Sequence, residues 1–134
     1  MPESKNKKVL IIDDDRFLLN MYSVKFHKSG FEVDTAISGQ EALTKLREGA
    51  SADIVLLDLV MPAMDGLELL ANIRKEKLIP RAVVVVLSNQ NQPADIERAK
   101  SLGIASYIVK ASSIPSEVVE EVIKVVGKSA GRKL

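Results

Sequence analysis

The sequence contains no cysteine and no tryptophan, and only 4% of its 134 residues are aromatic. Without cysteine the chain can form no disulfide, no thiolate metal site and no thiol nucleophile. No apolar run approaches the roughly 18 residues that crossing a bilayer requires. The polar start of the chain, residues 1–8, lacks the apolar core of a signal peptide. We therefore expect a cytoplasmic protein that does not insert into membranes.

The chain also lacks an excess of charge of either sign. Its 19 Lys and Arg residues face 18 Asp and Glu residues, so the formal net charge is only +1. Binding to nucleic acid through phosphates needs a basic excess, so we expect no direct nucleic-acid partner. The 46% of hydrophobic and 28% of charged residues are an ordinary balance for a globular protein, and the length fits one domain.

The sequence does contain a regular alternation of short apolar runs and longer helical patterns. Three of the runs are continuous, which is typical of strands buried on both faces, and two weaker runs suit the edges of a sheet. The continuous runs are residues 9–12, 54–57 and 82–87, and the weaker ones are 31–35 and 106–109. The helical patterns cover residues 16–28, 38 to about 49, 66 to before Pro80, 93–102 and 115–126.

Five consecutive strand–helix units predict an α/β fold with a parallel sheet and helices on both faces. We predict the flavodoxin-like, doubly wound strand order 2-1-3-4-5, since this order leaves the two weaker strands at the edges. One domain would cover residues 1–127, with 128–134 as a flexible tail or the start of a linker. Ligands of such sheets bind beyond the carboxyl ends of the strands, at the switch point between the first and third.

A polar residue stands at the carboxyl end of four of the five predicted strands. Crowded carboxylates repel one another, and Mg²⁺, which prefers oxygen ligands, can neutralise them. A carboxylate can attack phosphorus, while a hydroxyl and an ammonium group suit phosphoryl oxygens. Each residue taken singly is more often a turn, a cap or a surface residue, but the set together predicts a phosphoryl-transfer site. The residues are Asp13, Asp14 and Asp15 after the first strand, then Asp58, Ser88 and Lys110.

With these motifs the chain resembles the receiver domain of two-component response regulators, of the chemotaxis-regulator-like kind, over residues 8–127. The resemblance rests on segments 9–15 and 107–110, on Leu87-Ser88, and on the spacing of the acidic pair, Asp58, Ser88 and Lys110. Its most specific part is the stretch of residues 58–66, which ends in Met-Pro-Ala-Met-Asp-Gly.

The resemblance implies a signalling switch rather than an enzyme with a separate substrate. Asp58 would accept a phosphoryl group, with Ser88 and Lys110 in contact with that group. The domain would catalyse its own phosphorylation and, more slowly, its own dephosphorylation. The phosphodonor would be a phosphohistidine of a sensor histidine kinase or phosphotransfer protein, or a small acyl phosphate. Mg²⁺ (or Mn²⁺) would bind Asp13, Asp14, Asp58 and the backbone carbonyl of Val60.

The resemblance also implies how the signal is passed on. Ser88 and Tyr107 would form a switch, in which the tyrosine moves inward as the serine shifts toward the phosphoryl group. The face made by residues 93–102, 106–109 and 115–126 would then bind a downstream protein or a second copy of the chain. Tyr107 can also be read as a half-buried aromatic residue of an edge strand, and the lone His27 as a surface residue far from the site.

Three departures from the family pattern carry expectations of their own. Ala111 follows Lys110 where the family usually has proline, and a cis bond there would cost about 3–4 kcal/mol, so we expect a trans peptide. Asn89 replaces a smaller residue and would narrow access to the site. Val60 and Gln90 occupy positions that tune the lifetime of the phosphorylated state. Because an apolar Val60 cannot position a water molecule, we expect slow to moderate self-dephosphorylation.

Other functions fit the sequence less well. A phosphatase of the haloacid-dehalogenase type needs a second aspartate two residues after the nucleophile, where this chain has Val60. A nucleotide-binding domain would carry a glycine-rich loop after the first strand, and none is present. The remaining alternative is a pseudo-receiver, an interaction domain that works without phosphorylation, although none of the residues that such domains tend to lose is missing here.

Overall fold

The computed structural model describes residues 7–89, 92–110 and 114–131, with side chains up to residue 127. Its strands and helices alternate along the chain, as the sequence predicts. In order they are β1 (Lys8–Ile12), α1 (Arg16–Lys28), β2 (Glu32–Ala36), α2 (Gly39–Arg47), β3 (Ile54–Leu57), α3 (Gly66–Lys75), β4 (Val83–Ser88), α4 (Pro93–Ser101), β5 (Ser106–Val109) and α5 (Pro115–Gly131).

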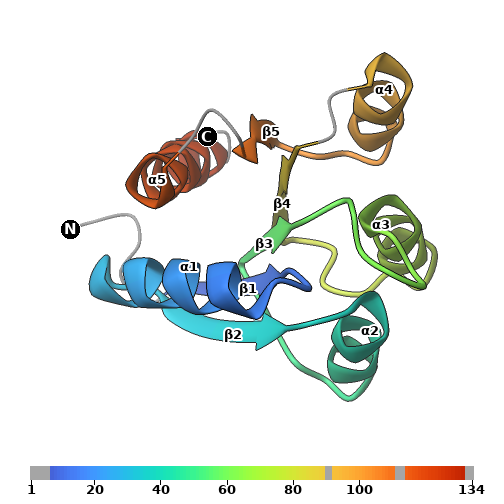
Figure 1. Ribbon diagram of the computed structural model, residues 1–134, viewed down its shortest axis with the longest axis horizontal. Helices are drawn as coiled ribbons and strands as arrows, with labels where there is room; N and C mark the ends of the chain where they lie inside the picture. The colour runs from blue at the N-terminus through green and yellow to red at the C-terminus, as the bar shows by residue number, and fades with distance from the viewer. Residues whose placement is uncertain (1–6, 90–91, 111–113, 132–134) are drawn as a thin grey trace.

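The five strands form one parallel sheet in the order β2-β1-β3-β4-β5, which confirms the predicted fold. Helices α1 and α5 cover one face, and α2, α3 and α4 cover the other (Figure 1). In the pairing of β1 with β3, Ile12 lies opposite Leu57. The residues that follow them, Asp13 and Asp58, therefore leave the sheet side by side.

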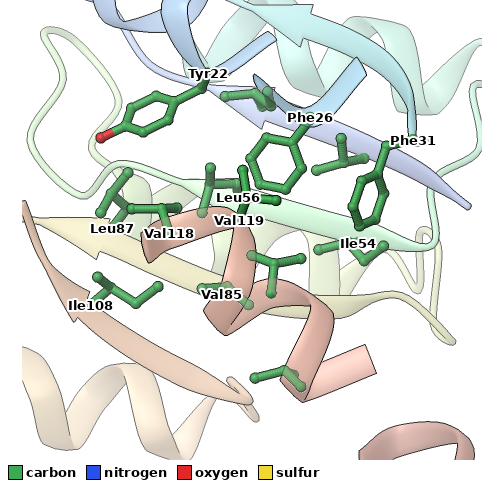
Figure 2. Packing of buried hydrophobic residues seen from close by; sticks show 14 of the residues in the cluster. Tyr22, Phe26, Phe31, Ile54, Leu56, Val85, Leu87, Ile108, Val118 and Val119 are labelled. Atoms are coloured by element: carbon green, nitrogen blue, oxygen red, sulfur yellow. The ribbon is translucent and has the colours of Figure 1, made fainter. Parts of the chain in front are cut away.

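Apolar packing on the two faces of the sheet fixes its carboxyl edge, where Asp13 and Asp58 lie. Beneath α1 and α5, Phe26 meets Phe31 edge-on with ring centroids 5.1 Å apart, and valines of α5 close the cluster (Figure 2). A second cluster joins the sheet to α2 and α3. Beneath α4 there is only a small third cluster, made by the buried residues Leu59, Leu67, Val86 and Ala99. The fourth helix thus has the smallest share of the core.

Side chains cap the helices that follow the strands of the site. Asp15 accepts hydrogen bonds from the backbone N–H groups of Phe17 and Leu18 at the start of α1. Asp65 accepts one from Glu68 at the start of α3, at 2.8 Å. Such caps satisfy N–H groups that have no partner within the helix. The third residue of the Asp13-Asp14-Asp15 run therefore has a structural role.

The structure moves several of the predicted boundaries. Strand β1 begins one residue earlier than predicted, and β2 and β4 each begin one residue later. Helix α3 ends at Lys75, whereas the prediction ran to just before Pro80. Helix α5 continues to Gly131, past residue 127, where the sequence predicts that the domain ends. The predictions about the Lys110–Ala111 peptide and about Gln90 are not tested, because Ala111 and Gln90 lie outside the described residues. Within the described part of the chain, no helix has the length and hydrophobicity needed to cross a membrane.

Candidate functional site

Two buried carboxylates form the centre of the site. Asp13 is 2% exposed and Asp58 6% exposed, whereas Asp14 is exposed. The Asp58 N–H donates to the Ile12 carbonyl at 3.0 Å, and the Asp13 N–H donates to the Ala36 carbonyl at 3.1 Å. These bonds continue the sheet pairing by one residue, so the backbone of both aspartates is fixed at the carboxyl edge.

Lys110, directly after β5, brings an ammonium group to both carboxylates. Its Nζ lies 2.9 Å from Asp13 Oδ2 and 3.3 Å from Asp58 Oδ2. Burial alone lowers the pKa of Lys110, but the hydrogen bond and charge of Asp13 and the charge of Asp58 outweigh it and leave this pKa raised. The lysine therefore stays charged, and it links the edge strand β5 to the centre of the sheet.

The ionised form of Asp58 remains disfavoured despite the positive charge of Lys110. Burial, together with the charge of Asp13, raises the pKa of Asp58 from 3.8 to about 6. Lys110 and a hydrogen bond at 3.3 Å from the Val60 N–H to Asp58 Oδ1 act in the opposite direction, but they do not cancel the shift. A further cation at this point would stabilise the ionised form.

The acidic residues lie close enough together to hold a hard divalent cation. Ligand oxygens of Asp13, Asp14 and Asp58 all lie within 4.8 Å of one another. An all-oxygen set with one or two carboxylates, and with room left for water or phosphate oxygens, is the coordination that Mg²⁺ prefers. Burial and the charge of Asp13 raise the pKa of Asp58, and a cation bound here would lower it. The residues therefore fit the predicted metal.

The loop between β3 and α3 folds back over the end of β3, and this accounts for the Met-Pro-Ala-Met-Asp-Gly stretch. The Gly66 N–H donates to the Leu59 carbonyl at 2.8 Å. A Cβ atom on Gly66 would lie 2.3 Å from the carbonyl oxygen of Asp58, so no other residue fits there without movement. Ala63 takes a φ of 67°, and the Met64 N–H next to it donates to the Pro62 carbonyl at 2.8 Å.

The predicted switch residues lie next to each other on β4 and β5. Ser88 ends β4 and is fully buried, and Tyr107 is half-buried on β5. Burial, with the charge of Asp95 on α4, raises the pKa of Tyr107, while a hydrogen bond with the Ser88 side chain lowers it. Tyr107 therefore bridges the site and helix α4. Asn89, the next residue after Ser88, is exposed.

Exposed apolar residues around the site were not predicted. The described part of the chain exposes four large apolar side chains, and three of them follow strands at the carboxyl edge. Phe17 is 75% exposed at the start of α1, Val60 is 50% exposed after Asp58, and Ile114 is 60% exposed before α5. Their sequence positions, in or beside strand-end loops, were the available signal. His27 is exposed on α1, as predicted.

Comparison with known proteins identifies the family. Residues 9–123 match the response regulator receiver domain. The chemotaxis protein CheY of Thermotoga maritima is 38% identical to 89% of the chain, which covers 97% of that protein. The alkaline phosphatase synthesis transcriptional regulatory protein PhoP of Bacillus subtilis is 33% identical to 84% of the chain, which covers 45% of it.

Solved structures agree. The chemotaxis protein CheY4 of Vibrio cholerae matches with a TM-score of 0.80 and 28% identity, over 90% of this chain and 98% of that one. A CheY-like receiver domain from Methanospirillum hungatei has a TM-score of 0.86 at 24% identity, over 96% and 99% of the two chains, and supports the fold. The chain belongs to the response regulator receiver family, a signalling family of two-component systems. It spans about half the length of the transcriptional regulators that it matches.

Proposed function

We propose that the protein is a phosphorylation switch that accepts a phosphoryl group on Asp58 from a phosphohistidine, in a reaction that depends on Mg²⁺. The observation that carries the proposal is the Lys110 ammonium group, which contacts the buried carboxylates of Asp13 and Asp58 beside the exposed Asp14. Buried charges that serve only stability are a costly arrangement, whereas perturbed carboxylates gathered at one edge are typical of functional sites.

The chemistry needs only one nucleophile. A carboxylate oxygen of Asp58 attacks phosphorus, the bond from phosphorus to the donor nitrogen breaks, and the leaving imidazole takes the electron pair. Lys110 stays charged, and together with the Ser88 hydroxyl it would stabilise the negative charge on the transferred oxygens.

Asp13, Asp14, Asp58 and the backbone carbonyl of Val60 would hold the Mg²⁺ (or Mn²⁺) ion. When bound, the ion would supply positive charge that neutralises the carboxylates and the phosphoryl oxygens. The protein's own part is to hold Asp13 and Asp58 side by side through β1 and β3, which the sheet pairing does.

The output would pass through Ser88 and Tyr107 to the surface made by α4, β5 and α5. The contact between these two side chains supports this, because a shift of Ser88 toward a phosphoryl group changes the surroundings of the Tyr107 hydroxyl. The phosphoryl group carries about two negative charges, about one more than the ionised Asp58 that it replaces, and this would favour one of two packings of this surface. In the favoured packing it would bind a downstream protein or a second copy of the chain.

The phosphodonor would be a sensor histidine kinase or a phosphotransfer protein. The support is the apolar rim, which we define as the exposed side chains of Phe17, Val60 and Ile114. Apolar side chains on three separate segments beside an acidic centre suit a protein that covers the centre during transfer. We further propose that the protein acts in the cytoplasm without binding nucleic acid, either alone or as the receiver part of a longer regulator.

The test is the intact mass of the wild type and of Asp58→Asn after incubation with acetyl phosphate, with Mg²⁺ and with EDTA. We expect one phosphoryl group on the wild type in Mg²⁺ only, and none on Asp58→Asn. The decay of this species tests Val60 as well, since an apolar side chain there should give slower release than Val60→Glu.

The same experiment tests the alternative, a pseudo-receiver that works without phosphorylation. A wild type that stays unmodified both with acetyl phosphate and with a phosphorylated histidine kinase would leave the fold intact and make the chain a pseudo-receiver. Asn89 would then be the first residue to replace, because it stands beside the site and is exposed. Equal modification of Asp58→Asn would place the phosphoryl group on another residue.

A further inference from the structure

The outer side of strand β2 is an edge of the sheet. The strand lies at one end of the strand order, with β1 as its neighbour. The Glu32 N–H and the Ala36 carbonyl bond to residues that flank β1, so both residues face that strand. Because the backbone groups of alternate residues point to the same side of a strand, Val33 and Thr35 face outward. Such an edge can pair with a strand of another chain.

An ion pair between β2 and α2 closes this edge at Thr35. The Thr35 N–H donates to Asp34 Oδ1 at 2.9 Å, and the Thr35 carbonyl accepts from Lys45 Nζ at 2.5 Å. Lys45 Nζ also donates to Asp34 Oδ1 at 3.0 Å. One carboxylate and one ammonium group therefore hold each other and occupy both outward-facing backbone groups of Thr35.

The pairing of two β2 strands depends on these Thr35 groups. Two copies related by a twofold axis bring their β2 edges together antiparallel, and outward-facing residues that lie opposite each other then exchange two hydrogen bonds. Within the 5 residues of β2, Val33 of each copy opposite Thr35 of the other gives four bonds, and Thr35 takes part in all four. Val33 opposite Val33, or Thr35 opposite Thr35, gives only two.

The register with four bonds also brings like charges together. With Val33 opposite Thr35, the residue between them, Asp34, lies opposite its own copy at the twofold axis. In such a pair the Cα atoms are about 4.5 Å apart, and like charges directly opposite each other are destabilising. Asp34 therefore opposes the pairing of two copies in two ways, through its bond to the Thr35 N–H and through its charge.

The α1 side of the same edge would favour association if the ion pair were absent. Val24 of α1 is 45% exposed there. It lies along a cavity of about 360 Å³ that is lined by Ser23, Val24, His27 and Lys28 of α1 and by Val33 and Thr35 of β2. Because opposite residues of paired strands share a face of the sheet, Val33 and Thr35 of a second copy would lie beside this cavity and cover apolar surface.

We propose that β2 is a pairing surface for a second copy of this chain, and that the Asp34–Lys45 ion pair keeps this surface closed by bonding to Thr35. The inference does not depend on phosphorylation. It concerns the edge of the sheet opposite to β5. The ion pair thus restricts contacts between copies to other surfaces of the molecule.

The first test is the oligomeric state of the full chain, measured by sedimentation equilibrium in EDTA without a phosphodonor. We expect the double variant Asp34→Ala/Lys45→Ala, whose net charge equals that of the wild type, to form a dimer at a concentration about tenfold lower or more. The matched control is Arg47→Ala/Glu76→Ala. It removes an ion pair that joins α2 to the end of α3, and it should associate no more than the wild type.

Further variants identify the surface that associates. Lys45→Ala alone should dimerise less than the double variant, because two uncovered Asp34 carboxylates would face each other. Adding Thr35→Pro to the double variant should restore the monomer, because proline has no N–H group and is tolerated on an edge strand. In the double variant, amide hydrogen exchange at Val33 and Thr35 should slow as the protein concentration rises, while exchange in β5 stays unchanged.

The wild type provides a test that needs no variant. After correction for intrinsic rates, its Thr35 amide should exchange about tenfold more slowly than its Val33 amide, because the bond to Asp34 protects it. Equal rates would overturn the closure of the edge. So would a folded double variant that associates no more than the wild type, or equal association of the Arg47→Ala/Glu76→Ala control. Growth beyond a dimer would overturn the twofold pairing, since each copy has one β2.

Discussion

At the scale of single residues, the ionised carboxylate of Asp58 destabilises the folded protein. Its pKa is about 6 in the folded protein, against 3.8 for an unperturbed aspartate, mainly because the group is buried and lies beside Asp13. Above pH 6 the group is ionised in both the folded and the unfolded chain, and the fold carries the full penalty. Between pH 6 and about 4 the folded protein takes up the proton first, so this penalty decreases as the pH falls.

We therefore expect Asp58→Asn to raise the free energy of unfolding by about 1–3 kcal/mol at pH 7.5 in EDTA. The gain should shrink as the pH is lowered from 6 to 4. Urea unfolding at a series of pH values measures it. Asp34→Asn is a contrasting control: burial raises the pKa of Asp34, but the hydrogen bond and charge of Lys45 outweigh it and leave the pKa lowered, so this variant should lose stability at pH 7.5. A gain for Asp58→Asn that is independent of pH would contradict the electrostatic cause.

The identity of these residues could be predicted from the sequence, but their energetics could not. Asp13, Asp58 and Lys110 stand at strand ends, and the strand order alone brings them together. The raised pKa of Asp58 depends on burial and on distances of a few ångströms, which the sequence does not contain. Asp95 was missed for a related reason, because its effect is on the Tyr107 hydroxyl of β5, and a sequence pattern does not show that the two are close.

At the scale of elements, the β3–α3 loop has a strained backbone at Ala63 and requires glycine at position 66. Ala63 has a φ of 67°, a left-handed conformation that costs an L-residue roughly 1–2 kcal/mol. Glycine adopts it freely but loses more entropy on folding. The Gly66 backbone, in contrast, lies so close to Asp58 that a methyl group would collide with it.

Opposite substitutions in this loop should therefore have opposite effects. We expect Ala63→Gly to raise the free energy of unfolding by about 0.5–1 kcal/mol, and Gly66→Ala to lower it by about 2–4 kcal/mol. Chemical denaturation of both variants beside the wild type provides the measurement. Destabilisation by Ala63→Gly would mean that the contacts of the alanine methyl group outweigh its backbone strain.

The helices show how far sequence patterns predict elements. All five helices begin within one residue of their predicted starts, because strong start signals mark them: Asp15, Ser38, Asp65, Pro93 and Pro115. The length of α5 was underestimated, because Gly127 reads as a stop signal although the helix continues to Gly131. The weak attachment of α4 was not predictable, since a helix with one buried residue has an ordinary apolar pattern in sequence.

At the scale of the whole molecule, the parallel sheet gathers side chains from three separate segments into the apolar rim. Phe17 is the most exposed of them, at 75%. We expect Phe17→Ala to slow phosphoryl transfer from a histidine kinase that phosphorylates the wild type by about tenfold or more, because exposed aromatic residues often dominate protein interfaces. The rate with acetyl phosphate should stay unchanged, since that donor needs no docking surface.

Val24→Ala provides the matched control for this prediction. Val24 is 45% exposed on the same helix, but it lies two turns further from the carboxyl edge. Transfer rates from the kinase, measured for both variants by gel or mass analysis, should fall for Phe17→Ala only. Equal losses with acetyl phosphate would instead mean that Phe17 shapes the site itself.

The single lysine between two aspartates also sets the size of the signal. Three carboxylates and one ammonium group give the resting edge about two units of negative charge, and a divalent ion would cancel them. Replacing the one charge of Asp58 by the two of a phosphoryl group would then add about one unit. At physiological ionic strength such a charge is screened within about 8 Å, so a distant partner could not sense it directly. The protein would have to convert that one unit of charge into a change of surface shape. A partner could then detect the phosphorylated state only by direct contact with that surface.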